Sequence, residues 1–226
     1  MKMKMITVIV VLVSMVCSIS QAGLIAEYDF NLDVSASSSV TDATAGDFVV
    51  GPGLDGYAGR SGTSKSMYAR ASGTVNIISV GDAIAGNDYL SVTIGANSGL
   101  EMNLTSLTLD YGYTREGPYD GKQMKLYLLT DIDGFTSADI VGSQTINVGP
   151  NIQSPIPYTA VSIDLSGAQF QGVTAATEFR FYLADTTGGA DYIHRIDNVE
   201  LNGTITPEPA TMCLLGLGGL LLRRKK

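Results

Sequence analysis

The chain of 226 residues has no tryptophan, one histidine (His194) and two cysteines. A single histidine leaves little for a zinc site, a haem site or a histidine base. Cys17 and Cys213 lie in the two terminal segments, so no disulfide can form within the region between them. Charged residues are only 16% of the chain, against ~25% in typical domains. The composition therefore argues against a fold of helices with charged outer faces.

The N-terminal segment has the pattern of a secretory signal peptide. Lys2 and Lys4 form a basic start, and the stretch 6–17 is apolar apart from Thr7 and Ser14. A small-x-small sequence ends at Ala22, immediately before Gly23. We expect cleavage between Ala22 and Gly23, which removes residues 1–22. The alternative is a buried N-terminal helix.

The last 21 residues read "TPEPATMCLLGLGGLLLRRKK". The apolar run 210–222 would span about 20 Å as a helix, whereas a bilayer core needs ~30 Å. Four cations end the chain, which fits a stop on the cytoplasmic side of a membrane. A short core helix is the structural alternative, although such a helix would rarely be followed by four cations.

The order of Pro207-Glu208-Pro209, a short apolar stretch and a basic end resembles the PEP-CTERM sorting signal of Gram-negative bacteria that make extracellular polysaccharide. Only Cys213, within the apolar run, departs from the pattern. The resemblance implies export, transient association with the inner membrane, and processing near Pro207, Glu208 and Pro209 by an exosortase-type enzyme. The mature protein would reach the cell surface or the extracellular matrix.

Removing both terminal segments changes the charge of the chain. The whole chain has a formal net charge of −8. Without the two N-terminal lysines and the four terminal cations, 8 basic residues face 22 acidic ones, or about −14 if Glu208 is kept. Such a surface repels the phosphates of a nucleic acid, and none is expected as a partner. Divalent cations and neutral or cationic partners suit it better.

Residues 23–205 read as one all-β domain. Apolar and polar residues alternate with period two, which predicts half-buried strands. The clearest windows are 24–30, 106–113, 123–130 and 178–185, and further candidates are 74–80, 89–96, 100–104, 141–148, 158–165 and 191–205. About ten short strands separated by turns indicate an antiparallel β-sandwich, of the jelly-roll kind. The segment 33–47, rich in Ser, Thr and Ala, is expected to be an exposed loop.

The stretch "RIDNVELNG" before the tail resembles the last strand of jelly-roll domains in PEP-CTERM proteins and in some carbohydrate-binding modules. The resemblance implies pairing of this last strand with the first, which would bring Asp197 near Glu27 or Asp29. Because strict alternation cannot bury both Ile193 and Ile196, we also expect a bulge between them.

Two patterns bear on catalysis. Glu27, Asp29 and Asn31 approach the E-x-D-x-E arrangement of sandwich-fold glycosidases, but Asn31 cannot exchange a proton as a carboxylic acid does. His194, the only candidate base, lies in a strand pattern typical of a structural or exposed histidine. We therefore expect no catalysis, with a polysaccharide-active enzyme (glycosidase or lyase) as the alternative.

Calcium is the one cofactor that the acidic chain suggests, in a structural role. Asp131 and Asp133 begin an oxygen-rich loop, although the spacing of an EF-hand is not met and a simple turn explains the same residues. A second hypothesis places an ion between Glu27 or Asp29 and Asp197, across the paired end strands.

The stretch "DYGYTREGPYDG" at 110–121 is the best candidate for glycan binding. Tyr111, Tyr113 and Tyr119 offer aromatic faces, while Arg115 and Asp120, with Asp110 and Glu116, offer hydrogen bonds. Tyr111 and Tyr113 also continue the apolar face of Leu107 and Leu109, which favours a place in the core instead. The sequence thus predicts an exported surface or matrix protein that binds extracellular polysaccharide, with the domains 1–22, 23–205 and 206–226.

Overall fold

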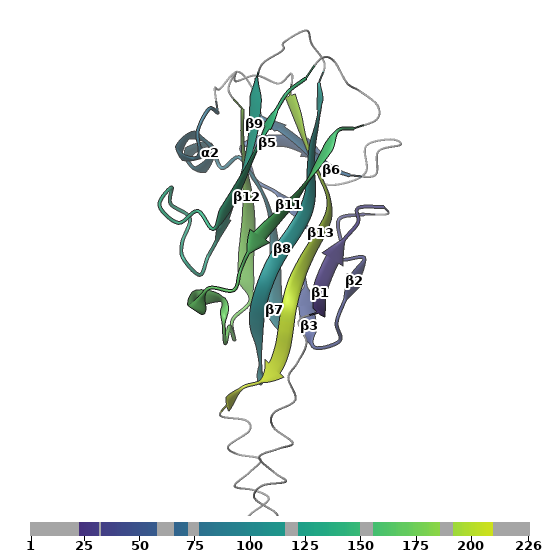
Figure 1. The fold of residues 1–226 in the computed structure, drawn as a ribbon, viewed down its shortest axis with the longest axis vertical. Helices are drawn as coiled ribbons and strands as arrows, with labels where there is room; N and C mark the ends of the chain where they lie inside the picture. The colour runs from purple at the N-terminus through teal and green to yellow at the C-terminus, as the bar shows by residue number, and fades with distance from the viewer. Residues whose placement is uncertain are drawn as a thin grey trace, which may run out of the picture.

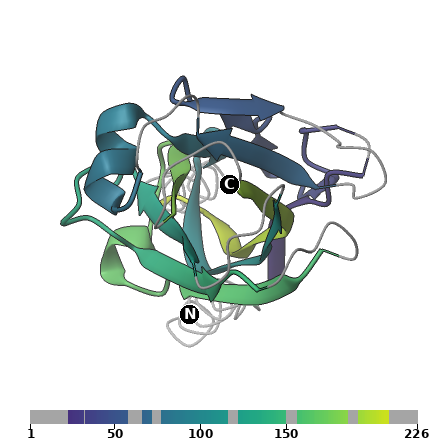
Figure 2. The ribbon, with the colours of Figure 1, turned by 90° about the horizontal axis from the view of Figure 1, so that it is seen from above.

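A computed structural model describes residues 23–31, 33–57, 66–71, 77–115, 122–149, 156–185 and 192–209. The described strands form two antiparallel sheets that face each other as layers (Figure 1, Figure 2). Sheet A contains β11 (Tyr158–Asp164), β8 (Leu100–Arg115), β13 (Tyr192–Pro207), β1 (Gly23–Tyr28), β2 (Ser38–Ser39), β6 (Met67–Ala71) and β5 (Leu54–Tyr57). Sheet B contains β10 (Gly142–Asn147), β9 (Gln123–Thr130), β12 (Thr177–Asp185), β7 (Tyr89–Ala96), β3 (Ala43–Ala45) and β4 (Val49–Val50).

The expected β-sandwich is confirmed. The chain passes from β10 in sheet B to β11 in sheet A, then to β12 in B and β13 in A, so it crosses between the layers as in a jelly roll. In sheet A the strand order is β11-β8-β13-β1-β2, and β6 also pairs with β13. The predicted pairing of the last strand with the first is therefore present, with Tyr28 opposite Val199.

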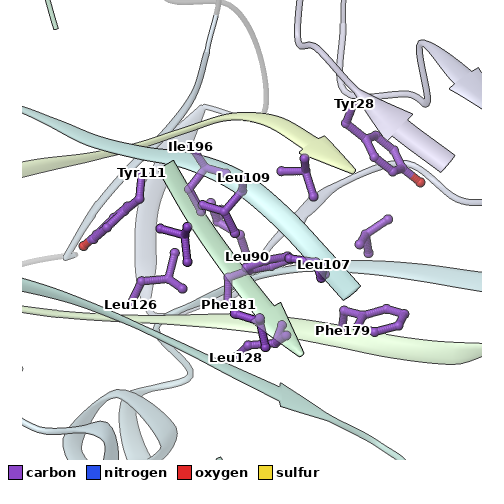
Figure 3. Close-up of a cluster of buried hydrophobic side chains, with 14 of the residues drawn as sticks. Tyr28, Leu90, Leu107, Leu109, Tyr111, Leu126, Leu128, Phe179, Phe181 and Ile196 are labelled. Carbon is purple, nitrogen blue, oxygen red and sulfur yellow. The ribbon is translucent and has the colours of Figure 1, made fainter. Parts of the chain in front are cut away.

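The core fills the space between the sheets, as alternation predicts (Figure 3). Its labelled members, all at most 3% exposed, are Tyr28, Leu90, Leu107, Leu109, Tyr111, Leu126, Leu128, Phe179, Phe181 and Ile196. Complete burial of one such leucine or phenylalanine side chain contributes ~1.5–3 kcal/mol. The apolar residues at period two thus face the core between the sheets, and the alternate residues of each strand lie on the outer faces.

The predicted strand at 74–80 is wrong where the structure describes it. Residue Val80 begins the helix α2 (Val80–Gly86), and Ser79 caps it. The Ser79 hydroxyl accepts the Asp82 N–H, while the Asp82 carboxylate accepts the Ser79 N–H, which completes a capping box. The helix packs beside Tyr182, Leu129 and Ala184 on the outside of sheet B. At seven residues, α2 is too short to show a helical period in the sequence.

Two local expectations about loops and bulges are also corrected. The segment 33–47 is not a plain loop, because it contains β2 and β3, which pair with β1 and β7. In β13 the register shifts between Asp197 and Glu200, not between Ile193 and Ile196. Asn198 takes a left-handed backbone there (φ 48), and Ile193 stays only partly buried. The bulge therefore lies at Asn198, a residue type that tolerates this conformation.

The end of the sandwich lies beyond the expected boundary at 205. Strand β13 runs to Pro207, which pairs with Leu100, and Thr206 pairs with Glu101. The fold and the C-terminal motif therefore overlap by two residues, 206 and 207.

Candidate functional site

The structure places Tyr111 and Tyr113 in the core, so the expectation that their rings face a sugar is wrong. They are 0% and 5% exposed. The Tyr111 hydroxyl lies 2.7 Å from Nδ1 of His194, which is itself buried, and the Tyr113 hydroxyl accepts the N–H of Gly149 at 2.8 Å. They continue the buried face of Leu107 and Leu109. The Arg115 side chain, Tyr119 and Asp120 lie outside the described residues, as does Glu116.

The residues that alternate with this core face lie on the outside of sheet A. In β8 they include Asp110, Gly112 and Thr114, and in β13 they include Arg195 and Asp197, because Ile196 points into the core. Arg195 is opposite Gly112, and Asp197 is opposite Asp110. The two central strands of sheet A, β8 and β13, thus place one cation and two carboxylates on one surface.

Arg195 is held tightly on this surface, with only 6% of the residue exposed. Its Nε donates to the Thr114 hydroxyl at 3.2 Å, and its guanidinium carbon lies 4.7 Å from the centre of the Tyr68 ring. Burial lowers the pKa of Arg195, and the nearby Tyr158 and Tyr68 hydroxyls oppose that shift. A guanidinium stacked on an aromatic face is stabilised by the ring quadrupole. This contact fixes both side chains in one geometry.

Tyr158, in β11, is paired with Gly112 of the neighbouring strand β8. A Cβ atom at Gly112 would come within 2.8 Å of Tyr158 Cδ1, so only glycine lets the ring take this position. The Tyr158 side chain is partly buried, and burial raises its pKa. The glycine of the "DYGY" stretch therefore makes room for an aromatic ring on the outer face.

The two carboxylates are organised by the bulge at Asn198. The Asn198 side-chain amide donates to Asp110 Oδ2 at 2.9 Å, and its backbone N–H donates to Asp197 Oδ1 at 2.9 Å. The pKa of Asp197 is raised to about 6, mainly by burial; the Asn198 hydrogen bond lowers it, and the charges of Asp110 and Asp29 also raise it. A bulge that gathers polar groups in this way is a common feature of functional surfaces.

An open groove of about 430 Å³ continues this surface along β11, β8 and β13. Polar lining comes from Thr108, Asp110, Ser162, Asn198 and Glu200. We call Tyr68, Asp110, Tyr158, Arg195 and Asp197 the outer-face cluster. It combines aromatic rings, a cation and carboxylates beside a groove. Aromatic surfaces with a few placed polar groups are chemically suited to binding a polyhydroxylated ligand.

The residues of the two calcium hypotheses lie on different sheets. Glu27 pairs with Glu200 in sheet A, and Asp29 accepts hydrogen bonds from Asn31. Asp131 follows β9 in sheet B, where it accepts the Glu178 N–H. Among the residues that the structure describes, no three His, Cys, Asp or Glu side chains are grouped to hold a metal ion. Calcium binding, at Asp131 and Asp133 or at Glu27, Asp29 and Asp197, stays a prediction.

The processing residues lie at the end of the fold. Pro207 is the last residue of β13, the Glu208 N–H donates to the Gly99 carbonyl at 3.0 Å, and Pro209 is exposed. Gly23 begins β1, and Ala22 lies outside the described residues. Within the described ranges, none of the helices is long and apolar enough to cross a membrane.

Comparison with known proteins identifies the tail. The family model of the PEP-CTERM protein-sorting motif matches residues 206–226, which confirms the resemblance and indicates export. No curated protein matches the chain.

Solved structures of similar shape include carbohydrate-binding modules. One is the mannan-recognising module TmCBM27, at 13% identity over 82% of this chain and 99% of that one (TM-score 0.41). Another is the xylan-binding CBM22-1 domain of Paenibacillus barcinonensis Xyn10C, at 12% identity over 80% and 95% (TM-score 0.36). A third is the K3 adhesin domain of Lys-gingipain from Porphyromonas gingivalis, at 10% identity over 80% and 100% (TM-score 0.42). Likenesses of this size say nothing about what this chain binds.

Sequence reasoning found Asp110 and Asp197 but missed Tyr68, Tyr158 and Arg195. Arg195 lies in "YIHRIDN", next to the only histidine. Alternation with the buried Ile196 already predicts that the Arg195 side chain lies on the outer face of the sheet. Tyr68 and Tyr158 lie in short segments far away in the sequence. Only the pairing of β6 and β11 with the central strands brings them to Arg195.

Proposed function

We propose that this chain is an exported, non-catalytic protein of the cell surface or extracellular matrix of a Gram-negative bacterium, and that its sandwich binds a glycan at the outer-face cluster. An exosortase-type enzyme processes its C-terminal motif during transient association with the inner membrane. The sorting motif supports the export and processing. The cluster supports the binding.

One observation carries the binding proposal: Arg195 is fixed against the Tyr68 ring, beside a groove lined by carboxylate, amide and hydroxyl groups. A sugar ring offers apolar C–H faces to an aromatic ring and hydroxyl pairs to carboxylates. Tyr158 supplies an aromatic ring on the same strand, β11, as Ala160 and Ser162, which line the groove. Asp110, which lines the groove directly, supplies the acceptor oxygens.

The test is a glycan array of neutral, N-acetylated, aminated and uronic-acid oligosaccharides, followed by titration of the best binder. The variant Tyr158→Ala removes the stacking face and should weaken binding roughly tenfold, since ~1.4 kcal/mol corresponds to a factor of ten. The variant Asp110→Asn keeps the shape and should weaken it to a similar extent. Tyr127→Ala is the matched control, because Tyr127 is a partly buried tyrosine on sheet B.

Unchanged affinity in both cluster variants would refute this site. The array is repeated with a chelator, which tests the calcium hypotheses. Loss of binding or a lower melting temperature in chelator would support a bound ion, and no change in either would contradict one.

A second candidate function rests on the pair of carboxylates. Directly opposed residues of neighbouring antiparallel strands have Cβ atoms ~4.5–5.5 Å apart, and Asp110 and Asp197 are such a pair. Glycosidases use two nearby carboxyl groups, one with a raised pKa as the acid, and the pKa of Asp197 is about 6. Turnover of a polysaccharide that disappears in Asp197→Asn would establish catalysis and overturn the non-catalytic proposal.

A further inference from the structure

The last strand of the sandwich enters the sorting motif. Strand β13 ends at Pro207, opposite Leu100 at the start of β8, at the lower end of Figure 1. The Glu208 N–H continues the pairing one residue further by donating to the Gly99 carbonyl at 3.0 Å. Two of the three residues of Pro-Glu-Pro are therefore fixed to the fold by backbone contacts.

Side chains reinforce this end of β13. The Thr206 hydroxyl accepts from the Asn103 amide at 3.2 Å and donates to the Glu101 carboxylate at 3.4 Å. These three residues come from the two paired strands, so the contacts join β13 to β8 at Thr206, immediately before Pro207. The motif consequently begins on a strand end that is held by main chain and side chains together.

The partner strand at this position is itself braced from its other side. Met102 exchanges two backbone hydrogen bonds with Val173, at 2.8 and 2.9 Å, and Met102 is fully buried. The Asn103 side chain accepts the Gly172 N–H at 3.0 Å. Strand β8 therefore cannot simply move away with β13, and freeing residues 206–208 requires β13 to separate from it.

A processing enzyme must bind the chain around the cut as an extended segment, with its backbone groups unpaired from the substrate's own sheet. Bonds held in a folded sheet are cut only from a locally opened state, in proportion to its population. We propose that the fold protects the chain through Glu208, so that the cut made during sorting falls on the C-terminal side of Glu208. This inference rests on the processing part of the proposed function.

The protection is measured without the sorting enzyme. The full chain, purified in mild detergent, is digested briefly with a protease of broad specificity. The intact mass of the stable product is then measured by mass spectrometry. The expected core ends at Glu208 or beyond it. A core that ends before Glu208 overturns the inference.

Two insertion variants show whether the fold sets the limit. A spacer of six Gly and Ser residues between Thr206 and Pro207 moves the motif off the strand, and the stable core should then lose Pro-Glu-Pro. The same spacer between Pro209 and Ala210 is the matched control, and its core should still retain Glu208. Equal loss of the motif in both variants, or in neither, contradicts the inference.

The cut itself is read from the mass of the secreted protein in the producing bacterium. A new C-terminus at Glu208 or between Glu208 and Lys226 supports the inference, and a chain that ends before Glu208 overturns it. A secreted chain that still ends at Lys226 refutes the proposed processing and, with it, the position of the cut. That failure is distinguishable, because the protease limit is measured independently.

Discussion

Replacing Asp197 by asparagine is expected to stabilise the fold at neutral pH. The pKa of this carboxyl group is about 6 in the folded chain, against an ordinary value of 3.8. One pKa unit corresponds to ~1.4 kcal/mol, so a fully buried group with this shift would destabilise the fold by ~3 kcal/mol. Asp197 is only partly buried, and solvent screening reduces the expected gain of the variant to ~1–2 kcal/mol.

The pH dependence follows from the direction of the shift. The folded chain binds this proton more tightly than the unfolded chain does, so the penalty is fully present above about pH 6. It shrinks as the pH falls through 6, and it is lost below the unfolded value of 3.8. Asp197→Asn should therefore gain stability at pH 7.5, and most of that gain should be absent at about pH 4.

The assay is denaturant unfolding of both chains at the two pH values. Titrating groups that do not act on Asp197, such as His194, whose pKa burial lowers to about 4, affect both chains equally and cancel in the difference. Asp164→Asn is the control, because hydrogen bonds from Ser166 lower the pKa of that exposed carboxylate, and it should show no gain. Equal stability of Asp197→Asn and wild type at pH 7.5, or a gain of the same size at both pH values, would refute the reasoning.

Three further substitutions test other parts of the structure. Tyr111→Phe leaves the buried Nδ1 of His194 without its hydroxyl partner. It should cost ~1–3 kcal/mol of unfolding free energy, measured in urea, and a loss below about 0.5 kcal/mol would contradict that bond. Gly112→Ala should displace the Tyr158 ring and weaken glycan binding by a factor similar to Tyr158→Ala, and titration giving wild-type affinity would contradict this geometry. Ser79→Ala removes the cap of α2 and should cost ~1 kcal/mol, whereas Ser79→Thr keeps the hydroxyl and should retain most of that stability, as chemical denaturation can check.

The charge of Asp197 affects both the stability of the fold and the proposed glycan site. A carboxylate that destabilises the fold at neutral pH is a typical cost of a binding surface. If Asp197→Asn is more stable and also loses affinity for the glycan, the carboxylate destabilises the fold but is needed for binding. The same variant thus links the energetics of the bulge at Asn198 to the proposed site.

Much of the fold was predictable because alternation is a local property. Leu126 and Leu128 follow each other at period two within one strand, and so do Phe179 and Phe181, and all four proved buried. The helix at Val80 was not predictable in this way, since one capping box and two turns carry too weak a signal. The bulge was expected between Ile193 and Ile196 but lies between Asp197 and Glu200, because Ile193 was taken as buried when it is only partly covered.

The candidate site was far less predictable. Alternation with Leu107 and Leu109 did favour the core for Tyr111 and Tyr113, and both are buried there, but nothing local indicated which residues meet on the outer face. Arg195 contacts the Tyr68 ring from β6 and the Thr114 hydroxyl from β8, and Tyr158 comes from β11. Pairings between such distant segments leave no periodic trace in the sequence.

By itself the sequence determined the long strands that face the core and the C-terminal sorting motif, because alternation and motif order are properties of neighbouring residues. The tertiary structure decided which aromatic rings are buried, which carboxylates face each other, and where the fold holds the sorting motif. Each of these depends on contacts between strands far apart in the chain, such as Pro207 with Leu100 and Arg195 with Tyr68. Such contacts exist only once the two sheets have closed over a common core.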